Sequence, residues 1–278
     1  QGKKAWKLDD SNQSLEFNLP DRAGFILPRK KEGFIIGFPN FIAISDQSFS
    51  SFEKICDVES TINETRINDA KVDPYGGIVF GTYNEDPDKT NRKPIANLYR
   101  LAPDLSLTHL LSNITVSNGI AFSQNENIMY FADTPTGRIQ KFKYSQDFNK
   151  FNELDSNIIF KDVGEPDGAT VDINNNYWSA RVRGKCIISI DTKKEKILEK
   201  INLPTNTPTC VTFGGNNLSS LYVTSLRADP TNDNEGGNLH RIETDTRGFE
   251  QLLADIWSYK NFLLTKFFSF SSGIFFKK

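Results

Sequence analysis

Short runs of alternating hydrophobic and polar residues recur along the chain, separated by Gly, Asn and Asp. Such runs are typical of β-strands joined by tight hairpin turns. Four clear units read strand, turn, strand, and a fainter fifth comes first; they occupy residues 27–37, 72–81, 122–133, 171–180 and 213–224. Further short strands follow them, as at residues 97–101 and 185–191. Units of this kind at intervals of about 45 residues predict the blades of a β-propeller.

The start of the chain differs from these units. Residues 1–19 have the pattern of the second half of a unit, without the hairpin that comes before that half elsewhere. The count of five full units and half of a sixth leads us to expect an all-β, six-bladed β-propeller, incomplete at the N-terminus. We expect it to occupy residues 1–250 as one domain, since all-β folds often run to about 200–250 residues.

The blade pattern ends near Glu250. The stretch that follows is rich in Phe and Leu, but Lys260 and Lys266 interrupt it, so it is too broken to span a bilayer. We expect residues 251–278 to form an aromatic-rich tail that is separate from the propeller. The alternative is a helix that packs on one face of the propeller.

Composition narrows the class of partner. The formal net charge is -2, which provides neither a basic field for nucleic acid nor a polybasic patch for a membrane. No apolar run is long enough to predict a membrane span. The three cysteines lie far apart, which fits a reducing compartment, and we expect Cys186 and Cys210 to be small core residues. The sequence therefore predicts a cytoplasmic monomer that binds neither nucleic acid nor membrane.

The available side chains restrict the chemistry. The chain has only two histidines, His109 and His240, and both lie in strand-like segments, so a His-based zinc site or a Ser-His-Asp triad lacks parts. Oxygen ligands remain. Asn68, Asn118 and Asp167 precede successive strands at intervals of about 50 residues, and a radially repeated fold brings such positions to one axis. Hard oxygen donors suit Ca²⁺, Mg²⁺ or Mn²⁺ and also accept Zn²⁺.

Several motifs together carry a family resemblance. They appear in the family's order, and they are residues 66–74 (RINDAKVDP), 81–82 (GT), 117–120 (SNGI), 166–168 (PDG), 177–180 (YWSA) and 213–215 (FGG). Over roughly residues 1–245 the chain resembles the gluconolactonase/regucalcin (senescence marker protein) family. The resemblance implies a six-bladed propeller that hydrolyses sugar lactones with one divalent cation.

The resemblance also implies roles for particular residues. Asn118 and Asp167 match two of the family's metal ligands, and Asp167 matches its acid/base, which takes a proton from the attacking water. Arg66 and Asn68 match the residues that hold the substrate's ring oxygen and hydroxyl groups. Asp86, with Glu85 beside it, aligns with an acidic substrate contact. The family's remaining metal ligand is a Glu in a Gly-Glu-Gly-Pro-type segment, which this chain does not contain; we expect that segment to lie upstream of Gln1.

Structural interpretations compete with these roles. Asp73 and Asp172 lie in hairpin turns and are expected to bond to their own backbone. Asn118 and Asp167 each precede a glycine, so each could be a simple turn residue.

Two other classes of function stay open at this point. The first is a catalytically inactive propeller that serves as a calcium-binding or partner-binding scaffold. The second is a propeller esterase of the paraoxonase or strictosidine-synthase kind. We rank the esterase lower, because those sites need a histidine or a glutamate-based centre that the motifs do not supply.

Overall fold

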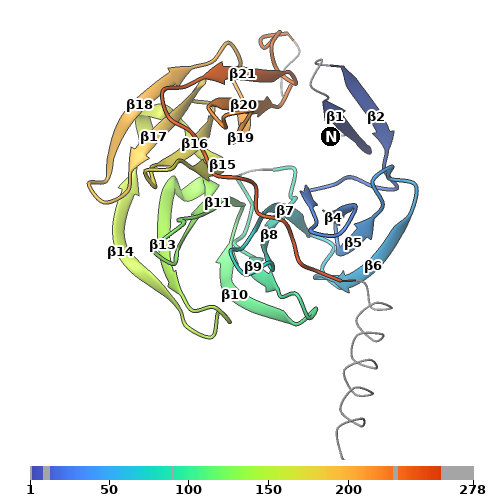
Figure 1. Ribbon diagram of the computed structural model, residues 1–278. Coiled ribbons are helices and arrows are strands. Elements are labelled where there is room, and N and C mark those ends of the chain that lie inside the picture. The colour runs from blue at the N-terminus through green and yellow to red at the C-terminus, as the bar shows by residue number, and fades with distance from the viewer. Residues whose placement is uncertain (1, 9–12, 89, 228–230, 258–278) are drawn as a thin grey trace, which may run out of the picture.

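Sheets of antiparallel strands surround a central axis in the computed structural model, which describes residues 2–8, 13–88, 90–227 and 231–257 (Figure 1). The first sheet is a hairpin of β1 (Lys4–Leu8) and β2 (Ser14–Asn18). Blade 1 contains β3 (Phe25–Pro28), β4 (Phe34–Gly37), β5 (Phe41–Ser45) and β6 (Phe52–Asp57). Blade 2 contains β7 (Thr65–Val72), β8 (Ile78–Asn84), β9 (Ala96–Leu101) and β10 (Leu107–Ile114).

The remaining sheets continue the ring in chain order. Blade 3 contains β11 (Ser117–Phe122), β12 (Ile128–Asp133), β13 (Arg138–Tyr144) and β14 (Phe151–Ile159). Blade 4 contains β15 (Glu165–Val171), β16 (Tyr177–Val182), β17 (Cys186–Asp191) and β18 (Lys196–Asn202). Blade 5 has three strands, β19 (Pro208–Gly214), β20 (Ser220–Ser225) and β21 (Leu239–Glu243). Two short 3-10 helices, η1 (Thr134–Thr136) and η2 (Lys161–Val163), complete the described secondary structure.

The prediction of an all-β propeller is confirmed. The described residues contain five blades, and the β1–β2 hairpin lies between blade 1 and the open edge of blade 5 (Figure 1). The count of six blades stays a prediction, because the hairpin has only two strands. The described part of the chain contains no helix long and apolar enough to cross a membrane.

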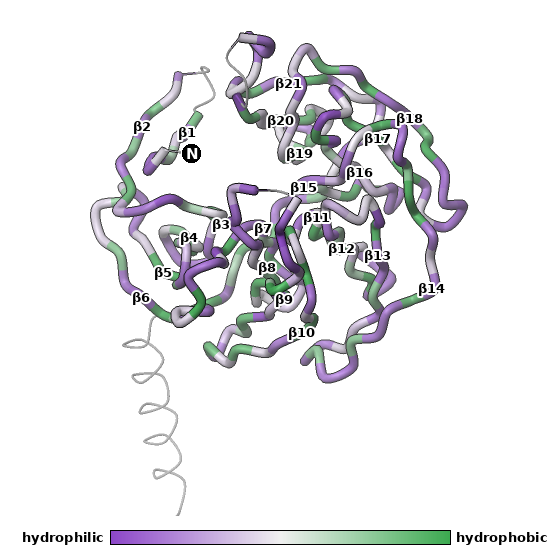
Figure 2. The backbone as a smooth tube through the Cα atoms, turned by 180° about the vertical axis from the view of Figure 1, so that it is seen from behind, coloured by the Kyte–Doolittle hydropathy of each residue, from purple (hydrophilic) through white to green (hydrophobic). Residues whose placement is uncertain are grey.

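The core lies between neighbouring blades, because each sheet is apolar on both faces. The innermost strand of blade 3, β11, is buried along its whole length, whereas the outermost strand β14 is largely exposed. Apolar clusters join blade 2 to blade 3, blade 3 to blade 4 and blade 4 to blade 5. Seen from behind, green hydrophobic and purple hydrophilic segments alternate around the ring (Figure 2). Burial between blades aligns the innermost strands β3, β7, β11, β15 and β19 around the axis.

Turn carboxylates hold the hairpins as predicted. Asp73 Oδ1 accepts hydrogen bonds from the backbone N–H groups of Tyr75 (2.7 Å) and Gly77 (3.2 Å). Asp172 Oδ1 accepts in the same way from Asn174 and Asn176, both at 2.9 Å. The structural interpretation of these two aspartates is therefore confirmed, and they take no part in the site described below.

The chain end does not follow the expectation of a separate tail. Residues 246–257, here called the C-terminal strap, cross the ring from blade 5 to blade 1 (Figure 1). Ala254 lies beside the end of β3, where its N–H donates to Pro28 O and its carbonyl accepts from Lys30 N, both at 2.9 Å. The side chains of Ala254 and Ile256 are buried in the cluster between blades 1 and 2. Residues 251–257 thus belong to the fold, and the rest of the expected tail lies outside the described residues.

Candidate active site

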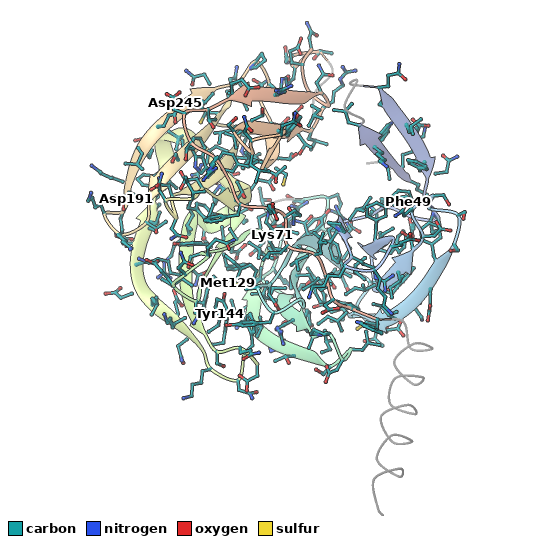
Figure 3. The ribbon with its side chains drawn as sticks, viewed as in Figure 1. Phe49, Lys71, Met129, Tyr144, Asp191 and Asp245 are labelled. Carbon is teal, nitrogen blue, oxygen red and sulfur yellow. The ribbon has the colours of Figure 1, made fainter. Side chains whose placement is uncertain are left out.

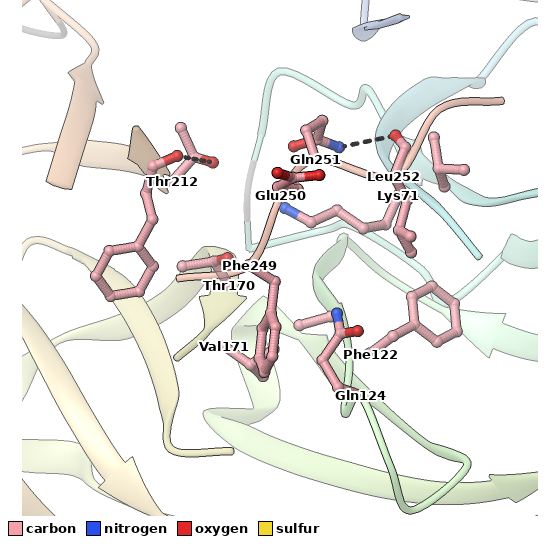
Figure 4. A pocket seen from close by; sticks show the side chains of 13 residues that line it. Lys71, Phe122, Gln124, Thr170, Val171, Thr212, Phe249, Glu250, Gln251 and Leu252 are labelled. Atoms are coloured by element: carbon pink, nitrogen blue, oxygen red, sulfur yellow. Dashed lines mark hydrogen bonds between the residues drawn. The ribbon is translucent and has the colours of Figure 1, made fainter. Parts of the chain in front are cut away.

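A cavity of about 650 Å³ lies on the axis and contains four of the five predicted site residues, Arg66, Asn68, Asn118 and Asp167. Asp86 does not line it. A second cavity of about 50 Å³ lies under the strap, between Phe249, Leu252 and the inner strands (Figure 4). Lys71 lines both cavities and lies near the centre of the ring (Figure 3). The central cavity is therefore the candidate site, because it holds the four predicted residues Arg66, Asn68, Asn118 and Asp167 together.

A shared irregularity of the inner strands explains why these positions converge. The pairing register shifts between Ile67 and Ala70 in β7, between Asn118 and Ala121 in β11, and between Pro166 and Ala169 in β15. A bulge of this kind turns a side chain away from the regular alternation of a strand. Each shift lies at or beside one of the polar residues Asn68, Asn118 and Asp167. The repeated motif is thus a repeated bulge that directs an oxygen toward the axis.

Glycine is required after Asn118. Gly119 has a φ of +66°, in the left-handed region that favours glycine, and a Cβ there would lie 2.5 Å from Tyr177 Oη. The Tyr177 hydroxyl donates to Gly119 O at 2.9 Å. The Ser-Asn-Gly sequence is therefore a backbone requirement of the bulge, and the same bulge carries the Asn118 side chain into the cavity.

The two asparagines bond directly. Asn68 Nδ2 donates to Asn118 Oδ1 at 3.1 Å and to the Ser117 carbonyl at 2.9 Å. Asn118 Nδ2 donates to Thr134 Oγ1 at 2.8 Å. Asn118 is only 6% exposed, so protein surrounds its amide on most sides. The Oδ1 atom faces the Asn68 side chain of blade 2.

Two carboxyl groups share the cavity wall. Asp167 Oδ1 accepts from Gly168 N at 2.9 Å. Burial deep within the ring, and then the nearby Asp69 carboxylate, raise the pKa of Asp167 well above its ordinary value. Burial also raises the pKa of Asp69, against the opposing effect of Lys71. Like charges held close together away from bulk water disfavour ionisation, and a bound cation would relieve that repulsion.

Arg66 is held in a charged network on one side of the cavity. Its Nε donates to Glu85 Oε1 at 2.8 Å and to Tyr83 Oη at 3.2 Å. Arg22 donates two hydrogen bonds of 3.0 Å to the same Glu85 carboxylate. Partial burial alone would raise the pKa of Glu85, but the two guanidinium groups hold it below its ordinary value. Glu85 is therefore an anion that fixes Arg66.

The acidic partner of Arg66 is thus Glu85, and Asp86 is turned elsewhere. Asp86 Oδ1 accepts from the backbone N–H of Asp88 at 2.9 Å, which closes a local turn. Side chains alternate along an extended chain, so Glu85 lies on the same side as Tyr83, and Tyr83 pairs with Arg66 across the two strands. The two-residue spacing of Tyr83 and Glu85 in the sequence is the signal that points to Glu85.

Cys210 differs from the expectation of a buried core residue. Cys186 is buried, as predicted, whereas Cys210 is exposed and lines the central cavity. It occupies the start of β19, where the inner strand faces the axis rather than a neighbouring sheet. Desolvation by the surrounding protein raises the pKa of its thiol to about 11, so the thiol stays protonated at neutral pH.

The donors suit a hard cation in part. Asn118 Oδ1 and the Asp167 carboxylate offer the amide and carboxylate oxygens that Ca²⁺ and Mg²⁺ prefer. Within the described ranges, no three His, Cys, Asp or Glu side chains converge closely enough to hold a metal ion. A cation held by the Asn118 amide and the Asp167 carboxylate would therefore keep positions for water or a substrate oxygen.

Comparisons with known proteins agree with this architecture. A family model described as SMP-30/gluconolactonase/LRE-like region matches residues 1–227. Regucalcin of Danio rerio is 31% identical over 228 residues, which cover 81% of this chain and 76% of the regucalcin. The 6-deoxy-6-sulfogluconolactonase of Pseudomonas putida is 30% identical over 223 residues, which cover 80% of this chain and 75% of that enzyme.

Among solved structures, a luciferin-regenerating enzyme matches with a TM-score of 0.84 and 28% identity, over 91% of this chain and 88% of that one. The first four blades, the first two strands of blade 5, the repeated bulges and the four cavity residues all fall within the region that the family model matches. This chain belongs to the SMP-30/gluconolactonase/LRE-like region family.

Proposed function

We propose that this protein is a cation-dependent hydrolase that opens sugar lactones. The observation that carries the proposal is the convergence of Arg66, Asn68, Asn118 and Asp167, from three different blades, in one cavity. Relatives that are named lactonases support the reaction class. Asn118 and Asp167 would hold the cation, with Ca²⁺, Mg²⁺, Mn²⁺ and Zn²⁺ as the candidates.

Each side chain has a role that follows from its surroundings. When bound, such a cation polarises a carbonyl oxygen and makes a coordinated water more acidic. Asp167 is the general base that accepts a proton from the attacking water, since Lys71 partly offsets the charge of the other cavity carboxylate, Asp69. Arg66, held by Glu85 and Tyr83, orients the ring oxygen and hydroxyl groups of the sugar together with Asn68. Fixed donors of this kind lower the barrier by positioning.

The direct test is hydrolysis of a panel of sugar lactones, with five-carbon and six-carbon rings, by protein stripped with EDTA and then supplied with one cation at a time. Calorimetry with Ca²⁺, Mg²⁺, Mn²⁺ and Zn²⁺ measures uptake in parallel. We expect turnover of at least one lactone that is lost with EDTA and restored by one of the four ions. Absence of both turnover and uptake would overturn the proposal.

A second candidate is a catalytically inactive propeller that binds a cation or a partner. The observation in its favour is that the described residues form no group of three His, Cys, Asp or Glu side chains that could hold a metal ion. A chain with few ligands can bind an ion without activating a water molecule. Uptake of an ion in calorimetry, with no hydrolysis of any lactone in the panel, would favour this scaffold over the enzyme.

The Arg66 network predicts which acidic residue matters for substrate. Glu85→Gln keeps the size of the side chain but removes the charge that holds Arg66, and a hydrogen bond to a charged group contributes about 1.5–3 kcal/mol. We expect kcat/KM for the lactone to fall about 10-fold or more, mainly through KM. Asp86→Asn, the matched control, should change kcat/KM less than about 2-fold. The reverse order of effects would favour the contact that alignment assigns to Asp86.

A further inference from the structure

We propose that Thr134 is a positioning residue that sets the orientation of the Asn118 amide and ties it to the segment carrying Asp167. Thr134 begins the short η1 turn after β12 and stands between the two inner strands that carry these residues. The effect of Thr134 on cation affinity rests on the proposed function, whereas its effect on the orientation of the Asn118 amide is independent of that function.

The Thr134 hydroxyl connects blades 3 and 4. Thr134 Oγ1 accepts a hydrogen bond from Asn118 Nδ2 at 2.8 Å and donates one to the Pro166 carbonyl, also at 2.8 Å. The backbone N–H of Thr134 donates to Val116 O at 3.0 Å. The Thr134 backbone is therefore fixed to the residue just before β11, and its hydroxyl donates across to Pro166 in β15.

The chemistry of these groups permits one polarity. A backbone carbonyl can only accept, so the hydroxyl must give its one proton to Pro166 O. Its oxygen is then left to accept, and the Asn118 amide must turn its NH₂ group toward Thr134. Because the two ends of a side-chain amide are opposite, this choice turns Oδ1 away from Thr134 and toward Asn68.

The opposite side of the amide follows the same logic. Asn68 Nδ2 donates to the Ser117 carbonyl, which can only accept, and to Asn118 Oδ1. The chain Asn68, Asn118, Thr134, Pro166 thus runs from one backbone carbonyl to another across three blades, and each of its hydrogen bonds joins a donor to an acceptor. Asn118 Oδ1 keeps one lone pair for the cavity, which is where a cation ligand is needed.

Asp167 is linked to the same chain through its neighbour. Pro166 O is the carbonyl directly before Asp167, and the register of β15 shifts just after it. By bonding that carbonyl, Thr134 restrains the start of the bulge that carries the Asp167 carboxylate. One hydroxyl therefore sets the position of both candidate ligands relative to one another, although it touches neither a cation nor a substrate.

The test uses three variants of the full chain. Thr134→Val keeps the shape and removes the hydroxyl, Thr134→Ser restores the hydroxyl, and Thr136→Val is the control. The Thr136 hydroxyl lies in the same turn and donates to Asp133 O at 2.7 Å, away from both ligands. Partners of this kind typically change metal affinity 10–100-fold. Calorimetric titration with Ca²⁺ and Mn²⁺ should show about that loss for Val and near wild-type affinity for Ser and for the control.

A second readout does not depend on a cation. The Asn118 side-chain ¹H–¹⁵N resonances of the cation-free protein should shift in Thr134→Val, and stay in place in Thr134→Ser and Thr136→Val. Unchanged resonances together with unchanged affinity in the Val variant would overturn the inference. If wild-type protein takes up no ion, the proposed function fails and the resonances alone decide about Thr134. Thr134→Ala, which cannot clash, replaces Val if the Val variant does not fold.

Discussion

Asp167→Asn is expected to abolish cation-dependent lactone hydrolysis. The substitution keeps the shape of the side chain but removes its charge, so the cavity loses both its anionic cation ligand and its general base. General-base catalysis alone typically contributes about 10²–10⁴-fold, and we expect kcat/KM to fall at least about 100-fold. Steady-state kinetics at saturating cation, with calorimetric titration of the same ion, measures the two losses separately.

The same substitution should stabilise the cation-free protein at neutral pH. The pKa of Asp167 is raised in the folded state, chiefly by burial and then by Asp69. A raised folded-state pKa favours the folded state at low pH, and this contribution is lost as the pH rises through that pKa. At pH 7 the folded protein must therefore either bury the unfavourable negative charge of Asp167 or take up a proton on that side chain. Both lower the stability of the folded state relative to the unfolded chain. Asp167→Asn removes this cost, so the thermal midpoint without cation should rise.

The control for this experiment is Asp162→Asn on the exposed η2 turn, which should change neither activity nor stability. Thermal melts between pH 5 and pH 8 with EDTA should show a smaller dependence on pH for Asp167→Asn than for wild type. Wild-type activity in the Asp167 variant would contradict its role as a base. A lower thermal midpoint of Asp167→Asn at pH 7 would contradict the expected stabilisation, but it would not bear on the expected loss of catalysis.

Arg100→Met is expected to produce the largest loss of stability. Arg100 Nε donates to Asp73 Oδ2 at 2.7 Å in an ion pair whose side chains are 6% and 0% exposed. The Arg100 guanidinium also lies 4.6 Å from the centre of the Phe148 ring. Removing one partner of a buried pair leaves the other charge without compensation, which costs about 3–5 kcal/mol. For a domain of this size we expect the thermal midpoint to fall by roughly 10 °C.

A double-mutant cycle separates the pair from the loss of packing. Asp73→Asn combined with Arg100→Met leaves no buried charge, so the double variant should recover part of the stability lost in Arg100→Met. Lys54→Met is the matched control, because its ion pair with Asp57 has side chains 55% and 58% exposed and exposed pairs contribute little. Equal losses for Lys54→Met and Arg100→Met would show that burial of the pair does not matter.

Much of the fold follows from local patterns. The two-residue alternation and the turn residues mark the blades, because hairpins depend on neighbouring residues and need no distant partner. Asp73 and Asp172 are recognisable as turn residues for the same reason. The regular spacing of Asn68, Asn118 and Asp167 also predicts one site, since a repeated unit places equivalent positions around one axis.

Other features depend on contacts between blades, and the sequence alone predicted them incorrectly. Cys210 has the apolar neighbours of a core residue, yet it faces the cavity because β19 lies on the axis. Residues 251–257 lack a strand pattern and were expected to leave the fold. They pack as a strap, because their backbone N–H groups donate hydrogen bonds to Pro28 O and Gly76 O. Their apolar side chains also fill the cluster between blades 1 and 2.

The sequence by itself determined the propeller, the turns and the three polar positions that meet at the axis, because each depends on a periodicity that adjacent residues carry. Only the tertiary structure decided that Glu85 holds Arg66 while Asp86 closes a local turn, and that Thr134 links Asn118 to Pro166. These choices depend on hydrogen bonds between residues that are far apart in the chain or that meet across a bulge. Such bonds have direction as well as distance, and neither quantity is encoded in the spacing of residues along a strand.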